Sequence, residues 1–289
     1  MSAIDLGMAN PWRTLDAALR GAGRRQTHQP TVRAVACITV HVDGPAVEVG
    51  RAQTPFGLYS AGRYAIRRGV QRHLEILARH GVSATFFACG YDVEQNPALF
   101  RDMRDAGHEI AAHGYLHEAW DLGDAEPALL EKTHRIIQDH LQLSPVGWCS
   151  PSGCKSARTL PTLQGLGYCY DASEKDMDRP YLAPGLDGFM VLPNNTVSLD
   201  DFPLYQAGQS LASEVYDNWV QELQALREAE GYIHLTVHPK AGGGSGTPAR
   251  AAVLDRFLGD LRGCNDLHIC TLQELALHCL GEPEAWSVA

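Results

Sequence analysis

The sequence predicts an α/β protein built on a parallel β-sheet, either closed into a barrel or doubly wound. Short apolar segments rich in β-branched residues alternate along the chain with helical patterns, and repeated βα alternation is typical of parallel sheets. Side chains suited to chemistry follow several of the predicted strands, where parallel α/β folds carry their functional groups. The sequence shows neither an internal repeat nor an interdomain linker, so we expect one main structural unit.

The predicted strands are short apolar runs bounded by turn residues. The first, residues 34–42, is rich in β-branched side chains, which favour extended backbone. Further strands are predicted at residues 83–88, 109–112, 147–150, 168–171, 189–192, 232–237 and 267–270.

Helices are predicted between these strands from apolar residues three and four positions apart. Val70, Leu74 and Leu77 mark one face of such a helix. Others are predicted near residues 99–103, 129–137 and 160–166 and over residues 211–227. Thr271 and Glu274 have the spacing of a capping box, which predicts a last helix after the final strand.

Composition favours a globular protein over other classes. The chain has 289 residues, 45% hydrophobic and 20% charged, enough to bury a substantial core. Its 34 acidic residues outnumber its 24 basic ones, and no long Lys/Arg run occurs, which argues against a nucleic-acid-binding surface. There is no apolar run of membrane-spanning length. We therefore expect neither nucleic acid nor membrane as a partner.

The N-terminal residues and the cysteines predict a cytoplasmic protein. Residues 1–30 lack a basic segment followed by an apolar one, so we do not expect a secretory signal. The eight cysteines form no C-x-x-C pair. In a reducing compartment most of them should be buried free thiols.

The sequence His113-Gly-Tyr-Leu-His117 is the most informative local feature. Two histidines four residues apart on a helical turn point the same way and can share one metal ion. A carboxylate from elsewhere, such as Asp43, would complete a 2-His-1-carboxylate set. Three protein ligands leave positions for water and substrate, which a catalytic metal site requires.

Other candidate residues also lie at predicted strand ends. His41 and Asp43 end the first strand, and their i, i+2 spacing places both on one face. His113 follows the third strand, Cys149 lies in the fourth, and His238 ends the strand at residues 232–237. Because the C-terminal strand ends of a barrel meet at one mouth, we expect these residues to share a cavity.

Five segments carry a family resemblance: HGVSATFF (80–87), AGHEIAAHGYLHE (106–118), LGYCYDAS (166–173), SLDDFP (198–203) and LTVHP (235–239). Together they resemble the NodB-homology polysaccharide deacetylases of carbohydrate esterase family 4. The closer branch holds peptidoglycan-deacetylase-like proteins, cyclic imide hydrolases and metal-independent allantoinases. The resemblance implies a distorted (β/α)7 barrel. We expect residues 1–33 to form an N-terminal arm and residues 34–289 to form the catalytic barrel.

The resemblance also implies roles for individual residues. Asp43, His113 and His117 match the family's metal ligands, and Zn2+ is the first choice for the divalent ion. His238 matches the histidine that protonates the leaving nitrogen. A polarised carbonyl, an activated water and an acid for the amine would make an amide hydrolase.

Two positions depart from the family pattern. His41 stands where relatives have the aspartate that serves as general base, and Cys149 stands where they have the arginine supporting it. Replacing both members together avoids leaving one buried charge without its partner. His41 then acts as the base, a fourth metal ligand, a substrate contact or a structural residue. Cys149 is a soft ligand, a nucleophile, a substrate contact or an inert buried thiol.

Further residues near these motifs are candidates for the cavity wall. Tyr115 and Trp120 flank the histidine pair and are interpreted as pocket walls or core. Asp201, with Asp200, could line the pocket, orient a histidine or cap a helix. The glycine-rich residues 241–246 predict a mobile loop at the mouth.

These features predict a metal-dependent hydrolase of a carbon–nitrogen bond in a small cytoplasmic amide, cyclic imide or N-acyl compound. Two alternatives remain: a non-catalytic descendant that binds a small molecule, and isomerase or lyase chemistry on the same metal site. Relatives of this branch often form tetramers, so the resemblance also implies a homo-oligomer, tetrameric or dimeric.

Overall fold

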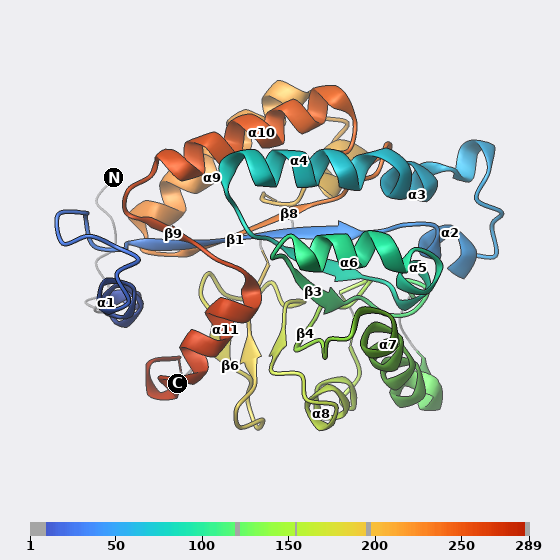
Figure 1. The fold of residues 1–289 in the computed structure, drawn as a ribbon, viewed down its shortest axis with the longest axis horizontal. Coiled ribbons are helices and arrows are strands. Elements are labelled where there is room, and N and C mark those ends of the chain that lie inside the picture. The colour runs from blue at the N-terminus through green and yellow to red at the C-terminus, as the bar shows by residue number, and fades with distance from the viewer. Residues whose placement is uncertain (1–9, 119–121, 154, 195–197, 287–289) are drawn as a thin grey trace.

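The computed structural model describes residues 10–118, 122–153, 155–194 and 198–286, which form one curled β-sheet with helices around it (Figure 1). Within these residues eight strands follow the order β6-β7-β5-β4-β3-β2-β1-β8, and β9 pairs with β1 outside this path. The pairings are parallel except that of β6 with β7. The predicted α/β class is confirmed, and the sheet curls into a half-barrel.

The strands differ greatly in length across this sheet. They are β1 (Ala34–Val42), β2 (Thr85–Ala88), β3 (Glu109–Ala112), β4 (Gly147–Trp148), β5 (Tyr170–Asp171), β6 (Tyr181–Leu182), β7 (Met190–Val191), β8 (Tyr232–Val237) and β9 (Leu267–Ile269). Strands β1, β3 and β8 begin and end at the predicted residues. The predicted strands at 147–150, 168–171 and 189–192 are each reduced to two residues.

The α-helices are α1 (Arg13–Gly21), α2 (Ala46–Gly50), α3 (Ala61–Tyr64), α4 (Val70–His80), α5 (Gly90–Gln95), α6 (Pro97–Asp105), α7 (Glu126–Leu141), α8 (Thr159–Gly165), α9 (Ala212–Glu228), α10 (Pro248–Gly263) and α11 (Leu272–Leu280). Helices α4, α9 and α10 lie above strands β1 and β8 in the view of Figure 1, and α7, α8 and α11 lie below them. Short 3-10 or π turns occur at Gly57–Tyr59, Ala65–Gly69, Gly123–Ala125, Pro203–Ala207 and Pro283–Trp286. Helices α1, α2, α3, α5 and α10 and strand β6 lie where no element is predicted. None of the helices in the described ranges has the length and apolar character needed to cross a membrane.

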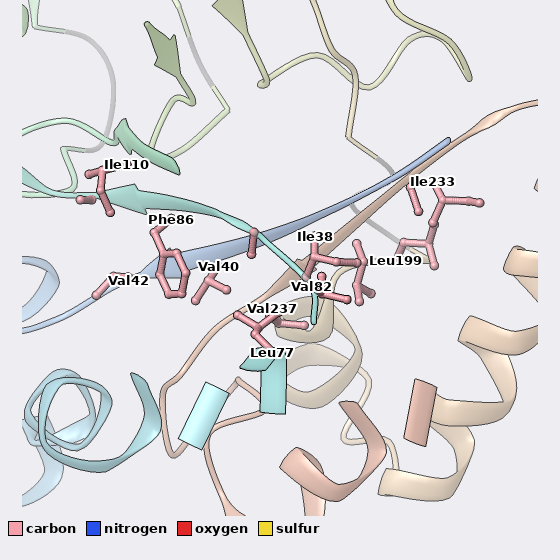
Figure 2. Close-up of a cluster of buried hydrophobic side chains, with 14 of the residues drawn as sticks. Ile38, Val40, Val42, Leu77, Val82, Phe86, Ile110, Leu199, Ile233 and Val237 are labelled. Atoms are coloured by element: carbon pink, nitrogen blue, oxygen red, sulfur yellow. The ribbon is translucent and has the colours of Figure 1, made fainter. Parts of the chain in front are cut away.

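Strand β1 separates two apolar layers because successive side chains of a strand point to opposite faces. Ile38, Val40 and Val42 belong to the larger buried cluster, which includes Leu77 of α4 and Phe86 of β2 (Figure 2). The alternate positions of β1 face the inside of the half-barrel. His41 lies on this second face, so the pleat itself directs its imidazole toward the concave side.

The N-terminal segment packs on the body of the protein. Trp12 belongs to the second buried cluster, and its ring lies 5.3 Å from that of Trp286. Its indole N–H donates a hydrogen bond to the backbone oxygen of Glu230, 2.9 Å away. The boundary proposed at residue 33 stays a prediction.

Candidate functional site

A cavity of about 900 Å³ opens at the C-terminal ends of the central strands. Its lining includes His41, Asp43, His113, His117, Cys149 and His238. These residues come from four separate strand ends or the turns that follow them. The five residues predicted to share a cavity, His41, Asp43, His113, Cys149 and His238, therefore do so, and His117 joins them.

Asp43, His113 and His117 form a compact group of potential metal ligands. The Asp43 Oδ1 atom lies 3.8 Å from His113 Nε2 and 3.6 Å from His117 Nε2. One donor atom from each residue lies within 4.8 Å of the other two. This spacing suits a single ion placed among the three atoms.

The backbone fixes the orientation of His113. The ring Nδ1 lies 2.7 Å from the carbonyl oxygen of Cys149, which can only accept, so Nδ1 carries the hydrogen. The Nε2 lone pair then faces Asp43. Burial, with His117 nearby, lowers the pKa of His113 to about 3, which keeps the ring neutral and able to ligate.

The segment after β3 is an irregular turn, so the expectation of a helical turn is wrong. Gly114 has φ +69° and His117 has φ +56°, and these left-handed residues interrupt a helical path. The Glu118 carboxylate accepts hydrogen bonds from the backbone N–H groups of Tyr115 and Leu116. His117 thus occupies a sparsely populated conformation that directs its ring toward Asp43.

The residues of this group fit a divalent metal ion. Asp43 Oδ1 is buried and has no hydrogen-bond partner among the described residues, a costly arrangement unless a ligand supplies the partner. Burial alone would raise the pKa of Asp43, but His117 and Lys240 hold it well below its usual range. One carboxylate and two imidazole nitrogens are ligands typical of zinc and similar ions.

The loop that carries Asp43 is held by a second carboxylate. Asp92 accepts hydrogen bonds from the backbone N–H groups of Gly44 (2.9 Å) and Ala46 (3.1 Å). Gly44 is required here because a Cβ would lie 2.6 Å from the Asp92 carboxylate carbon. This contact sets the direction in which the chain leaves β1.

His41 lies between the metal-ligand group and His238. Its ring centroid is 4.7 Å from that of His113 and 5.2 Å from that of His238. Its Nε2 is buried without a hydrogen-bond partner in the described part of the chain. Burial and the neighbouring His113 keep the pKa of His41 well below its usual range, so the ring is neutral.

His238 has the opposite environment because Asp201 is its partner. Its Nδ1 donates to Asp201 Oδ1 over 2.7 Å, and Asp201 also accepts the backbone N–H groups of His238 and Ser245. Burial opposes charge on His238, but the Asp201 carboxylate raises its pKa to about 9. Asp201 is fully buried and is absent from the described lining of the cavity, whereas Asp200 lines it. Of the roles predicted for Asp201, orienting a histidine matches its contacts with His238, and its role as a substrate contact stays a prediction.

The glycine-rich residues 241–246 pack closely against this pair, and Gly242 and Gly243 line the cavity. The mobility of this loop stays a prediction. Gly244 is buried, and a Cβ there would lie 2.2 Å from the His238 carbonyl oxygen. Ser245 contributes the N–H group that Asp201 accepts. Glycine serves close approach of two backbones at this point.

Cys149 lies in the cavity wall as a buried thiol. Its Sγ donates to the Ala172 carbonyl oxygen over 3.4 Å. Burial raises its pKa to about 12, which keeps the thiol protonated and argues against a nucleophilic role. Its Sγ lies within 4.8 Å of potential ligand atoms of both His41 and His113.

The aromatic wall predicted beside the histidine pair is not supported for Tyr115. Its hydroxyl donates to Glu94 over 3.1 Å, and the Nζ of Lys132 lies 3.3 Å from its ring centroid. It is absent from the described lining of the cavity. Trp120 lies outside the described residues.

Several lining residues have no counterpart in the sequence predictions. They are Ser150, Ser173, Lys175, Asn194, Phe202 and Lys240. Lys240 stands out because it is buried, and its Nζ lies 3.7 Å from Asp43 Oδ2. Its position two residues after His238, at the same strand end, is the sequence feature that could have predicted a place in the cavity.

Comparisons with known proteins agree with this geometry. A family profile described as "Polysaccharide deacetylase" matches residues 61–170. A chitooligosaccharide deacetylase of Bradyrhizobium sp. (strain ANU 289) is 46% identical over 179 residues, which cover 57% of this chain and 80% of that protein. A peptidoglycan deacetylase-like protein of Gibberella zeae is 33% identical over 172 residues, covering 57% of this chain and 50% of that one. The chain spans about half the length of the first curated relatives that it matches.

A solved structure gives the same result over most of the chain. A Mycobacterium smegmatis protein described as a candidate polysaccharide deacetylase superposes with a TM-score of 0.76 at 30% identity. The match covers 86% of this chain and 91% of that one. This confirms the resemblance identified from the sequence. By sequence and by fold, the chain belongs to the polysaccharide deacetylase family, the NodB-homology group of carbohydrate esterase family 4.

Proposed function

We propose that this chain is a metal-dependent hydrolase that cleaves the carbon–nitrogen bond of a small amide, cyclic imide or N-acyl compound. The observation that carries the proposal is the convergence of Asp43, His113 and His117 around a buried carboxylate oxygen that lacks a partner among the described residues. The His238–Asp201 pair at the same cavity supports it. So does membership of a family whose relatives are named as deacetylases of peptidoglycan and chitooligosaccharides.

Asp43, His113 and His117 would hold the ion, with zinc the first choice. A divalent ion bound there supplies Lewis acidity, which polarises the scissile carbonyl and favours water as a nucleophile. The Cys149 carbonyl keeps His113 in the tautomer whose Nε2 is free to ligate. The protein residues then need to move two protons.

His41 is placed to accept the first proton. Its neutral ring presents an unpartnered Nε2 beside the metal-ligand group. As the attacking water forms the new bond to the carbonyl carbon, His41 takes up the proton that the water loses. The resemblance implies that an aspartate takes up this proton in relatives. An imidazole can do the same near neutral pH.

His238 is placed to deliver the second proton. Because Nδ1 is bonded to Asp201, the Nε2–H faces the cavity as the available donor. When the carbon–nitrogen bond breaks, the nitrogen receives this proton and leaves as the amine, and the acyl part leaves as a carboxylic acid. Asp201 stabilises the charged form of His238 until that transfer.

The test combines metal analysis with a substrate screen. Purified protein should contain about one divalent ion per chain, and His113→Ala should lose it, because two ligands hold zinc poorly. Cyclic imides, hydantoins and N-acyl amines should include a substrate that wild type hydrolyses and His113→Ala does not. Full metal occupancy in the variant, or no hydrolysis of any amide by metal-loaded wild type, would overturn the proposal.

A non-catalytic binding protein is the second candidate. The specific observation in its favour is that position 41 carries a histidine and position 149 a thiol, so the base and arginine of relatives are both replaced. Metal binding and ligand binding without turnover of any amide would favour it. Turnover to a product that has not gained water would instead indicate lyase or isomerase chemistry.

A further inference from the structure

Lys240 is a buried cation at the floor of the cavity. It follows β8, is 6% exposed and contributes to the cavity lining. Its Nζ lies 3.7 Å from Asp43 Oδ2, beyond hydrogen-bonding distance, and this is the one ion pair that it makes among the described residues. A buried ammonium without a close hydrogen-bond partner is costly, which makes its presence here informative.

The other carboxylates of the lining form no ion pair with Lys240 in the described residues, and each accepts a backbone N–H group. Glu48 accepts the Gly62 N–H over 3.2 Å, and Glu118 accepts the Leu116 N–H over 2.8 Å. Asp200 accepts the Phe202 N–H over 2.9 Å. Within the described residues, Asp43 is the carboxylate that forms an ion pair with Lys240, and Asp43 is also the predicted metal ligand.

A divalent ion at this site would compete with Lys240 for the same carboxylate, Asp43. Relatives are expected to have a base aspartate and an arginine where this chain has His41 and Cys149, so neither of those charges is present here. The positive charge of Lys240 then lies beside Asp43, which would also bind the divalent ion. An anionic group on the ligand would offset this charge and supply the missing hydrogen-bond acceptor.

We propose that Lys240 binds a carboxylate of the substrate, so that the substrate is a small amide carrying its own carboxylate near the scissile bond. An N-acyl amino acid or the monoamide of a dicarboxylic acid has this chemistry. The inference rests on the proposed function, since it specifies the substrate of the same site. The Nζ atom of Lys240 and the Nε2 atoms of His113 and His117 each lie within 4 Å of an oxygen of Asp43. A small molecule can therefore contact Lys240 and the metal-ligand group at the same time.

The experiment compares N-acetylglycine with its uncharged amide, N-acetylglycinamide. Binding of each probe is measured by calorimetry on zinc-loaded and chelator-treated protein, for wild type, Lys240→Met and Lys175→Met. Lys175 lines the same cavity, but it is exposed and its Nζ donates to the Ser173 carbonyl oxygen over 3.0 Å, so it is the matched control. Metal content and thermal unfolding of each variant are measured in parallel.

Wild-type, zinc-loaded protein should bind the acid about tenfold or more tightly than the amide, as expected for a charged hydrogen bond. Lys240→Met should bring this ratio close to one while keeping its metal, and Lys175→Met should keep the wild-type ratio. An unchanged ratio in folded, metal-loaded Lys240→Met would overturn the inference, as would equal weakening of both probes.

The two levels of proposal fail in different ways. Hydrolysis of neutral amides by wild type, with no preference for carboxylates, would refute anion recognition and leave the hydrolase assignment standing. A preference for the acid that depends on Lys240, without hydrolysis of any amide, would refute the hydrolase assignment and support the binding site.

Discussion

His41 and His238 are buried to the same extent, 7% exposed each, and their rings lie 5.2 Å apart, yet their pKa values move in opposite directions. The pKa of His41 is lowered by burial and by its neighbouring histidines. For His238, burial is outweighed by Asp201, and its pKa rises to about 9. The difference shows that the hydrogen-bonded partner, more than the depth of burial, sets the protonation state in this cavity.

A neutral and a protonated histidine side by side provide a proton acceptor and a proton donor within one site. The two environments come from different elements. His41 belongs to the inner face of β1, and Asp201 reaches His238 from the segment just before Pro203–Ala207. The following predictions test whether His41 and His238 have the different roles in proton transfer that their different surroundings favour.

The largest effect is expected from His41→Ala. Removing the proton acceptor should lower the turnover rate by about 10²–10⁴-fold, the usual contribution of a general base, with metal content retained. Steady-state kinetics on one confirmed substrate, with metal analysis, measures both. Loss of the metal would make His41 a ligand, and near-wild-type turnover would exclude the base role.

Placing the aspartate and the arginine of relatives at positions 41 and 149 tests whether the two positions act together. His41→Asp alone should recover little activity, because Cys149 cannot supply a positive partner. His41→Asp with Cys149→Arg should recover more than the single change. Equal activity of the single and double variants would show that the two positions do not act together.

Asp201→Asn should lower the pKa of His238, so that both His238 and His41 are neutral near neutral pH. Without the anion, the pKa of His238 falls from about 9 and the ring loses its proton near neutrality. Turnover at pH 8 should drop by about 10–10²-fold, and the alkaline limb of the rate profile should move to lower pH. Activity should return partly at acidic pH. An unchanged profile would contradict the assignment of His238 as the acid.

The same pair predicts a pH dependence of stability. Since the folded pKa of His238 is raised, its contribution is fully present below the unfolded value of about 6.5 and is lost as pH rises through about 9. The loss in unfolding free energy should be on the order of 1–3 kcal/mol. Urea unfolding of metal-free protein at pH 6, 8 and 10 measures it. Asp201→Asn should lose stability less steeply over this range.

Cys149→Ser should have the smallest effect. The thiol is protonated, and the atom that holds His113 is the backbone oxygen of residue 149, which the change keeps. Turnover should stay within about tenfold of wild type, as for a side chain without a proton-transfer role. A loss as large as that of His41→Ala would indicate that Sγ takes part in the chemistry.

The sequence predicted the central strands well and the far side of the sheet poorly. Strands β1, β3 and β8 are mostly apolar and buried along their whole length, and their predicted bounds match the structure. At the β4–β7 side, each strand is two residues long, so curvature and pairing set its limits rather than any local pattern. Helix α10 was readable, because its buried Leu254, Phe257, Leu258 and Leu261 have helical spacing.

The site divides in the same way. Side chains at strand ends, such as Asp43, His113 and His238, follow from strand pattern and resemblance. The turn at His117 depends on positive φ values at Gly114 and His117, and the sequence pattern does not predict a positive φ at a histidine. Lys240 was missed although it lies two residues after His238, because its contact with Asp43 exists only once β1 and β8 pair.

The hydrogen bond from His113 to the carbonyl of residue 149 has a consequence for how this site can change over time. A carbonyl group is common to all twenty amino acids, so the ligand's orientation does not depend on which side chain occupies position 149. Substitutions there are free to alter charge and size at the cavity wall while the ligand stays in place. A lineage could therefore exchange arginine for cysteine, or the reverse, and explore new substrates without first dismantling its metal centre.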